Sequence, residues 1–333
     1  MLKRVRILRW LAAIFCLCLI AFAITAWWAS SEIIHPPRRS LQDYHLEMLG
    51  NPAKFGLIIR PFEVHDAISG AKPTPCLLCE PDLRETGARG AKLREQLIAR
   101  GLSLPEHGKI IGTLVLLHGR KGRKEDGLPI AERFCAAGFR CLLPDLPAHG
   151  DNENEIASYG LNEWNLPNAV MQEATKQFGI PASPRALWGI SQGGSVAVHA
   201  AAKTPWDTLI VVSSFADFDE LCLAQSRRLF GPFSGMLHAA VQALVEKRAG
   251  YRADQICPIA YVRRLEIPTL IAHGTDDALI PVSSGKALFE ALPGTDKQWI
   301  IVEGGTHDHV LTTPMPLYAE MTAFYLSHLP KSH

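Results

Sequence analysis

The fold of this chain is decided by the stretch Arg185-Ala186-Leu187-Trp188-Gly189-Ile190-Ser191-Gln192-Gly193-Gly194-Ser195. A short apolar strand leads into a serine flanked by glycines, and the small residues at 196–202 then open a helix. In so tight a turn, side chains two positions either side of the serine would collide, so Gly189 and Gly193 supply the room. We therefore expect Ser191 on a strained turn, with its hydroxyl exposed at the carboxyl edge of a sheet, where the helix aims its N–H groups at negative charge.

The pattern Gly-x-Ser-x-Gly is not specific by itself. Glycine and serine are common, and the same five residues also form ordinary strand-to-helix turns without chemistry. The remaining strands, and the polar residues that follow them, must decide between these two interpretations.

Buried strands alternate with helices along the body of the chain. Continuous apolar runs, typical of strands covered on both faces, occur at 112–117, 139–143, 185–190, 208–212, 267–272 and 298–302. Helical patterns occur at 87–100, 129–137, 166–178 and 315–329, and two further strands are predicted at 55–65 and 74–80. This alternation predicts an α/β fold, a mostly parallel sheet with helices on both faces, whose ligands bind at the carboxyl ends of the strands.

Two of the last strands are followed by an acid and by a histidine. Asp277 comes after the strand at 267–272, and His307 comes after the strand at 298–302. The order serine, acid, histidine is that of the α/β-hydrolases. Over roughly 55–329 the chain resembles the serine-hydrolase branch of this superfamily. The stretch 257–281 resembles the dienelactone-hydrolase, prolyl-oligopeptidase and membrane-anchored bacterial hydrolase groups, with cysteine at 257 where serine is usual.

The resemblance assigns a catalytic role to each of these residues. Ser191 is the expected nucleophile, His307 the general base and Asp277 the acid that orients the imidazole and balances its charge. The oxyanion hole is expected to consist of the backbone N–H groups of Gln192 and Arg120. This chemistry requires no cofactor, and no clustered ligands suggest a metal.

Other acids and histidines remain as alternatives. Asp276 adjoins the expected acid, Asp217 follows an earlier strand, and His309 is a second candidate base. Three further histidines precede glycines in turns after strands, and we expect each to have a structural role with a bond to nearby backbone: His118, His149 and His273.

The N-terminus differs in composition from the rest of the chain. Four basic residues within 3–9 precede the uncharged stretch Trp10–Ala29, whose length is near the ~20 residues that cross a bilayer as a helix. Trp27 and Trp28 suit the membrane interface. We expect an uncleaved anchor, with a signal peptide cleaved near Ala26 as the alternative. The excess of basic residues before the span predicts a cytoplasmic N-terminus and a catalytic domain outside the cytoplasm. In a bacterium this domain would be periplasmic. If the segment is cleaved, the domain would be secreted.

These boundaries divide the chain into three parts. We expect a membrane anchor or signal sequence at 1–29, a tether at 30–52 and the hydrolase domain at 53–333. Within that domain, 217–263 interrupts the strand–helix alternation with helical patterns and is a candidate helical cap over the site.

Charge and cysteine usage narrow the partners. The 333 residues carry a net charge of +1 at pH 7, which gives no indication of a nucleic-acid partner. The loop at 120–124 is strongly basic. We expect a solvated loop, with binding of acidic or phosphate-bearing substrates or anionic lipid heads as the alternative.

Cys76 and Cys79 lie in a predicted strand, ~10 Å apart and too far for a disulfide with each other. The sequence does not decide whether either of them forms a disulfide with another cysteine of the chain.

These features predict a serine hydrolase that cleaves a carboxylic ester of a small-molecule acyl substrate through an acyl-enzyme. The ester follows by analogy, as the commonest chemistry of the fold. A serine peptidase or amidase of the same fold is the first alternative, and a thioesterase is not excluded. A non-catalytic scaffold, tethered to the membrane to bind a ligand, is the alternative of a different class.

Overall fold

The computed structural model describes residues 2–330, so Met1 and residues 331–333, at the ends of the predicted anchor and hydrolase domain, lie outside it. An eight-stranded sheet has the order β1-β2-β4-β3-β5-β6-β7-β8. β2 runs antiparallel to β1 and β4, and the other neighbours are parallel. The strands are β1 (Leu57–Val64), β2 (Thr74–Pro81), β3 (Gly112–Leu117), β4 (Phe139–Pro144), β5 (Arg185–Ile190), β6 (Thr208–Val212), β7 (Thr269–Gly274) and β8 (Lys297–Val302).

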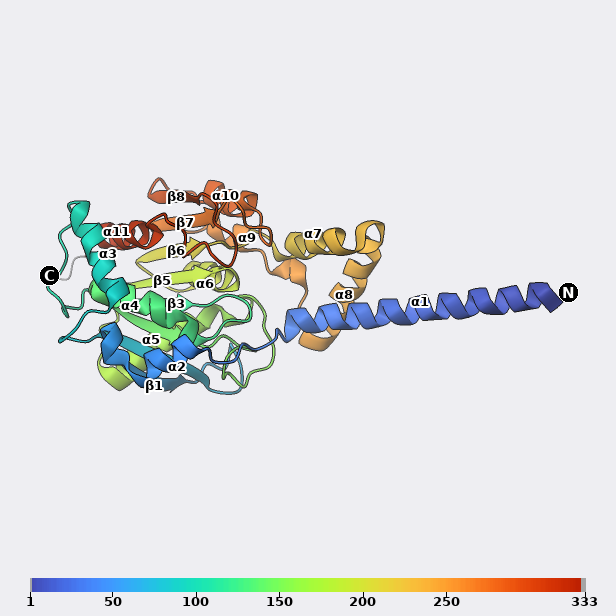
Figure 1. The fold of residues 1–333 in the computed structure, drawn as a ribbon, viewed down its shortest axis with the longest axis horizontal. Helices are drawn as coiled ribbons and strands as arrows, with labels where there is room; N and C mark the ends of the chain where they lie inside the picture. Colours follow the sequence, from blue (N-terminus) through green and yellow to red (C-terminus); the bar gives the residue numbers. More distant parts are fainter. Residues whose placement is uncertain (1, 331–333) are drawn as a thin grey trace.

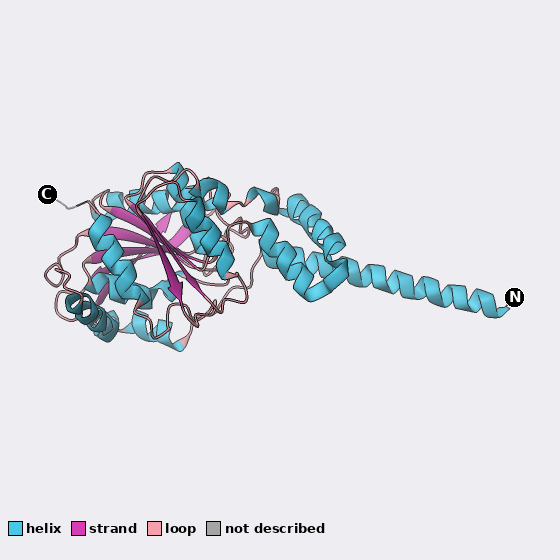
Figure 2. Ribbon diagram, turned by 90° about the horizontal axis from the view of Figure 1, so that it is seen from above, coloured by secondary structure: helices cyan, strands magenta, loops and turns pink. Residues whose placement is uncertain are grey.

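Helices cover both faces of this sheet (Figures 1 and 2). On one face, one apolar cluster joins the strands to α3 (Ala88–Ala99), α4 (Leu128–Ala136) and α11 (Leu317–His328). On the other face, a second cluster joins them to α5 (Leu166–Phe178), α6 (Gln192–Lys203), α9 (Pro258–Val262) and α10 (Val282–Ala291). The predicted α/β architecture is thereby confirmed.

The side-chain alternation of β3 shows why these strands read as continuous apolar runs. Leu114 and Leu116 belong to the first cluster, whereas Val115 and Leu117 belong to the second. Successive side chains of a strand point to opposite faces, so a strand covered by helices on both faces must be apolar at every position.

A long helix, α1 (Leu2–Ile34), projects from this body (Figure 1). It is long and apolar enough to cross a membrane, judged by length and composition. The large apolar side chains from Val5 to Trp28 are mostly exposed along it. The helix continues past Ala29, where we expected the anchor to end, and its last turns pack on the body. The predicted tether contains α2 (Asp43–Gly50) and the start of a short 3-10 helix, Pro52–Phe55.

The segment predicted as a cap is a helical hairpin. α7 (Phe218–Phe230) and α8 (Ser234–Ala249) are joined through the short turn Gly231–Phe233 and lie beside α1 (Figures 1 and 2). A third apolar cluster contains residues of both α1 and α8. The remaining short 3-10 helices are Lys124–Gly127, Glu163–Asn165 and Ala253–Gln255.

Candidate active site

Ser191 lies on the turn between β5 and α6 in a conformation rarely adopted by a residue with a side chain, φ 54° and ψ −120°. The two flanking glycines are required sterically. A Cβ at Gly189 would lie 2.2 Å from the carbonyl oxygen of Gly193, and a Cβ at Gly193 would lie 2.2 Å from that of Leu117. The Ser191 N–H donates to the Val212 carbonyl at 2.9 Å, which fixes the turn against the neighbouring strand.

Three polar residues meet at the carboxyl edge of the sheet. His307 Nε2 lies 3.0 Å from Ser191 Oγ, and His307 Nδ1 lies 2.7 Å from Asp277 Oδ2. The residues follow β5, β7 and β8, so the parallel sheet brings together positions that are 86 and 30 residues apart, by subtraction of their numbers. In this arrangement the imidazole can take the proton of the serine hydroxyl, while the carboxylate orients the imidazole and balances its charge.

Asp277 is buried and accepts several hydrogen bonds. Its Oδ1 accepts the N–H groups of Leu279 at 3.0 Å and Ile280 at 2.8 Å. His273 Nε2 donates to the Ile280 carbonyl at 2.9 Å and lies 3.5 Å from Asp277 Oδ2. Burial raises the pKa of Asp277, but the bonds from His273, His307 and the Ile280 N–H outweigh it and hold the pKa well below its ordinary value. The group therefore stays ionised near neutral pH.

The alternative acids have other partners. Asp276 is exposed and accepts a bond from the Thr275 hydroxyl at 2.9 Å. Asp217 accepts the Glu220 N–H at 3.0 Å and caps the N-terminus of α7. A carboxylate at this position stabilises the first turn of a helix, which accounts for Asp217 without a role in chemistry.

The turn-forming histidines bond to backbone, in agreement with their expected structural role. His118 Nε2 accepts the Leu146 N–H at 3.0 Å, and His149 Nδ1 donates to the Pro147 carbonyl at 2.8 Å. His309 has no bond to the Ser191 hydroxyl among the contacts of residues 2–330, whereas His307 has one.

The turn that follows β3 lies against the serine. A Cβ at Gly119 would be 3.3 Å from the Cβ of Ser191, so the glycine permits this close approach. Gln192 is the first residue of α6, where an N–H has no partner within the helix. Within residues 2–330, the N–H groups of Gln192 and Arg120 donate no bond to a backbone carbonyl outside the regular elements. Both expected oxyanion donors are thus uncommitted.

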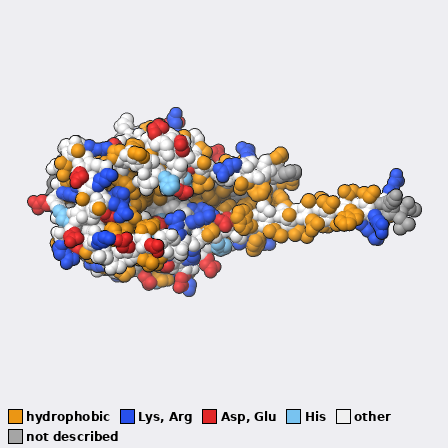
Figure 3. Space-filling view, viewed as in Figure 1, with side chains coloured by type: hydrophobic (Ala, Val, Ile, Leu, Met, Phe, Trp, Pro, Cys, Tyr) orange, Lys and Arg blue, Asp and Glu red, His pale blue; other side chains and the backbone are white. Residues whose placement is uncertain are grey.

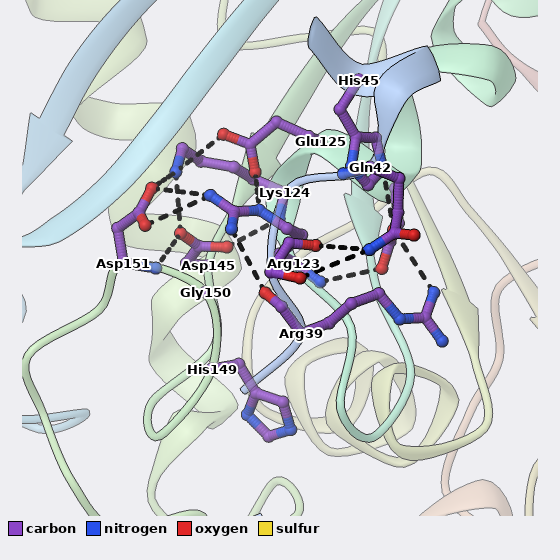
Figure 4. Close-up of polar contacts among 12 residues, drawn as sticks. Arg39, Gln42, His45, Arg123, Lys124, Glu125, Asp145, His149, Gly150 and Asp151 are labelled. Carbon is purple, nitrogen blue, oxygen red and sulfur yellow. Dashed lines mark hydrogen bonds and ion pairs between the residues drawn. The ribbon is translucent and has the colours of Figure 1, made fainter. Parts of the chain in front are cut away.

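Two of the four cations in the basic loop after this turn are buried, so our expectation of a solvated loop was wrong for this part of it. Arg123 and Lys124 are buried, and Figure 4 shows them among carboxylates. Lys124 Nζ lies 2.9 Å from Asp145, and Arg123 Nη2 lies 3.0 Å from Asp151. Two charges near the sheet edge are therefore held by acids that follow β4, because a buried cation needs a paired carboxylate.

Arg120 carries a third charge of this loop and pairs with the end of α1. Its guanidinium lies 2.6 Å from the Glu32 carboxylate and also donates to the Glu32 carbonyl at 2.8 Å. Lys121, in contrast, is exposed. The loop thus joins the N-terminal helix to the turn beside Ser191.

A cavity of about 320 Å³ opens beside Ser191 and His307. Its walls are largely apolar, with Ile130, Trp188 and Leu311 among them. The volume is within the range of small-molecule sites, ~300–1,000 Å³. Among the residues that line it, none comes from 217–263 of the described chain, so the hairpin is not a wall of this cavity.

Arg39 and Tyr44 line the same cavity, although they lie in the segment predicted as a tether. The Tyr44 hydroxyl donates to Asp126 at 3.2 Å, and His45 Nε2 lies 3.0 Å from the same carboxylate. Figure 4 shows the neighbouring Arg39 and His45 with the ion-pair cluster. No local pattern in the sequence indicates these contacts, because their partners are more than 80 residues away.

Within the described residues the cysteines form no disulfide, and no group of side chains is suited to hold a metal ion. Cys76 and Cys79 face opposite sides of the sheet, and all eight cysteines are free thiols. Burial raises the pKa of Cys76 and Cys79 well above the ordinary value, so both thiols stay protonated. Among residues 2–330 there is no group of three or more His, Cys, Asp or Glu side chains that could hold a metal ion.

Known proteins share both the sequence pattern and the fold. The model of the alpha/beta hydrolase family matches residues 114–321. The uncharacterized protein YqkD of Bacillus subtilis is 28% identical over 226 residues, covering 66% of this chain and 72% of that protein. A thermostable monoacylglycerol lipase of Bacillus sp. is 22% identical over 229 residues, covering 65% of this chain and 90% of that protein.

Among solved structures, the esterase Pf2001 of Pyrococcus furiosus is similar with a TM-score of 0.64 and 14% identity, covering 89% of this chain and 100% of that one. At this identity the likeness shows the fold alone. The family match covers more than half of the chain and includes the strand, turn and helix around Ser191. The protein therefore belongs to the alpha/beta hydrolase family.

Proposed function

We propose that this protein is a serine hydrolase that cleaves carboxylic esters through an acyl-enzyme, with Ser191, His307 and Asp277 as its catalytic triad. The observation that carries the proposal is the unbroken hydrogen-bonded path from Ser191 Oγ to His307 at 3.0 Å and from His307 to Asp277 at 2.7 Å. The relatives named as a monoacylglycerol lipase and as the Escherichia coli esterase YjfP support an ester substrate.

In the first half-reaction, Ser191 Oγ attacks the carbonyl carbon of the ester while His307 Nε2 takes its proton. Asp277 is ionised and accepts the Nδ1–H of His307, so Nε2 is left free to act as the base. The negative charge on the carbonyl oxygen is stabilised by the N–H groups of Gln192 and Arg120. One such donor typically contributes ~2.7–4 kcal/mol of transition-state stabilisation.

The tetrahedral intermediate collapses when the alcohol leaves and takes the proton from His307 Nε2, which gives the acyl-Ser191 ester. A water molecule then attacks this ester while His307 removes its proton. The second intermediate releases the carboxylic acid and returns the proton to Ser191 Oγ. The apolar walls of the cavity would hold the acyl chain.

The membrane attachment is the second part of the proposal. α1 anchors the protein with its N-terminus in the cytoplasm and the catalytic domain on the other side. Support comes from the apolar length of α1 and from the basic residues before the uncharged stretch. Intact-mass measurement of the membrane-extracted protein tests cleavage, and a protease added to sealed vesicles of known orientation tests the topology.

A fluorophosphonate probe tests the triad on the full chain. Such a probe forms a covalent bond with an activated serine, so wild-type protein should be labelled and the Ser191→Ala variant should not. Ser195→Ala is a matched control, because this serine lies one turn further along α6 and bonds to the Tyr159 carbonyl at 2.6 Å. Labelling that persists in Ser191→Ala, or full ester hydrolysis by it, would reject the assignment.

A further inference from the structure

The charges of α1 mark the part of the helix that can lie in hydrocarbon. No charged residue occurs between Arg9 and Glu32. These 22 intervening residues (positions 10–31) span about 33 Å at ~1.5 Å per residue, close to the ~30 Å hydrocarbon thickness of a bilayer. If α1 crosses a membrane, Glu32 therefore lies near the surface on the side of the catalytic domain.

The α7–α8 hairpin packs on α1 on the membrane side of Glu32. Leu237 and Val241 of α8 share an apolar cluster with Ala26 of α1, and Phe22 packs against the same cluster. Phe22 precedes Glu32 by ten residues, which is about 15 Å along the helix axis at ~1.5 Å per residue. Figures 1 and 2 both show the hairpin alongside the part of α1 nearest the body. The hairpin thus occupies the depth of one leaflet.

The end of this hairpin, residues 229–236, carries exposed apolar side chains. Leu229 is 64% exposed and Met236 is 67% exposed, with Phe230 partly buried between them. Figure 3 shows hydrophobic side chains along α1 and on the surface where α1 meets the rest of the molecule. Between Leu221 and Val245 the hairpin contains no Asp or Glu, although such acids stand at its base. An exposed apolar end without acids is unfavourable in water and favourable in hydrocarbon.

The cations nearest this end have side chains long enough to reach back to polar surroundings. Arg228 donates to the Ala278 carbonyl at 3.2 Å, which also ties the hairpin to the loop that carries Asp277. At the base, Arg248 lies 4.0 Å from the Trp27 ring and donates to Ser30 at 2.6 Å. A tryptophan with an arginine is typical of the membrane interface.

We propose that the end of the α7–α8 hairpin, residues 229–236, inserts into the leaflet on the side of the catalytic domain. With α1 it forms a two-point attachment that sets the orientation of the body. The occupant of this surface is the acyl-chain region of the bilayer, because the hairpin continues the apolar surface of α1 at the same depth.

The attachment places the cavity at the membrane surface. Glu32 pairs with Arg120 at 2.6 Å, and the turn that contains Arg120 lies against Ser191 through Gly119. Glu32, which lies near the membrane surface, is thus connected to Ser191 through its ion pair with Arg120 and the turn that contains Gly119. If the proposed ester chemistry holds, on which this step rests, the substrate is an acyl ester lipid taken from that leaflet rather than a soluble ester.

The depth of the hairpin can be measured without any activity. The full chain, with the exposed Cys16 and Cys18 changed to Ala, is given a cysteine at Leu229 or Met236, labelled with nitrobenzoxadiazole and reconstituted in phosphatidylcholine vesicles. Lipids spin-labelled on the acyl chain should quench both dyes. The matched control is a cysteine at Ile98 of α3, which is 59% exposed on the body and should not be quenched. The parent without an added cysteine gives the background of the remaining thiols.

Equal quenching at Leu229, Met236 and Ile98 overturns the insertion. Mutual quenching of dyes between protein copies, in place of quenching by lipid, would assign the surface to a second copy instead.

The substrate is tested with the double variant Leu229→Ser/Met236→Ser. Its hydrolysis of a long-chain monoacyl ester in vesicles should fall at least fivefold, while hydrolysis of soluble p-nitrophenyl acetate stays unchanged. Equal rates on both substrates overturn the lipid step. Absence of all hydrolysis and of Ser191 labelling rejects the proposed function and leaves the depth measurement intact.

Discussion

Replacement of Asp277 by Asn separates the role of its charge from its role in holding the loop. The Asn oxygen can still accept the N–H groups of Leu279 and Ile280, which Asp277 Oδ1 accepts at 3.0 and 2.8 Å. The amide nitrogen then faces His307 Nδ1, 2.7 Å from the present Oδ2. Because this nitrogen only donates, Nδ1 must accept, the proton moves to Nε2, and Nε2 no longer accepts the Ser191 proton.

The wrong tautomer should lower kcat by about 10⁴, the loss known for the equivalent substitution in a serine protease. This corresponds to ~5.4 kcal/mol at 1.36 kcal/mol per tenfold. Steady-state hydrolysis of p-nitrophenyl butyrate by the full chain measures it, with thermal denaturation as a check of the fold. Asp276→Asn is the control, because this neighbouring side chain bonds only to Thr275 among its side-chain contacts in the described residues, and its kcat should change less than twofold. A loss below tenfold in Asp277→Asn would refute the reasoning.

Three further predictions concern stability and the turn around Ser191. Lys124→Ala leaves the Asp145 carboxylate buried without its partner at 2.9 Å, so the free energy of unfolding in urea should fall by ~3–5 kcal/mol. Lys121→Ala in the same loop should change it by less than ~0.5 kcal/mol, and equal effects of the two variants would contradict the buried pair. Burial lowers the pKa of His149 to about 3 and that of His199 to about 4, whereas an unfolded histidine binds a proton below ~6.5. The unfolded state therefore binds more protons between pH 6.5 and 4, so the free energy of unfolding should fall as the pH is lowered through this window. The double variant His149→Gln/His199→Gln should show a weaker dependence of this free energy on pH, and an unchanged dependence would contradict the role of these two histidines. Gly193→Ala places a Cβ 2.2 Å from the Leu117 carbonyl and should abolish fluorophosphonate labelling, whereas Gly235→Ala, with nothing within 4 Å of its Cβ, should label like wild type.

The sequence by itself indicated the sheet and the positions of the three residues at its edge. Both depend on local rules: apolar runs predict strands covered on two faces, and Gly189 and Gly193 are required by the steric crowding around a tight turn. Because parallel strands end at one edge, the residues that follow β5, β7 and β8 lie at the same edge of the sheet. The edge argument places several polar residues there, and the resemblance to the α/β-hydrolases selects Ser191, Asp277 and His307 among them.

Only the tertiary structure decided how the flanking segments relate to the site. Arg123 and Lys124 of the basic loop are buried because Asp145 and Asp151, which follow a different strand, pair with them. Tyr44 lines the cavity because α2 docks on Asp126 from more than 80 residues away, and the hairpin lies along α1 instead of lining the cavity. Local periodicity shows which residues are apolar or charged, but their partners are set by packing between distant segments, which no local pattern contains.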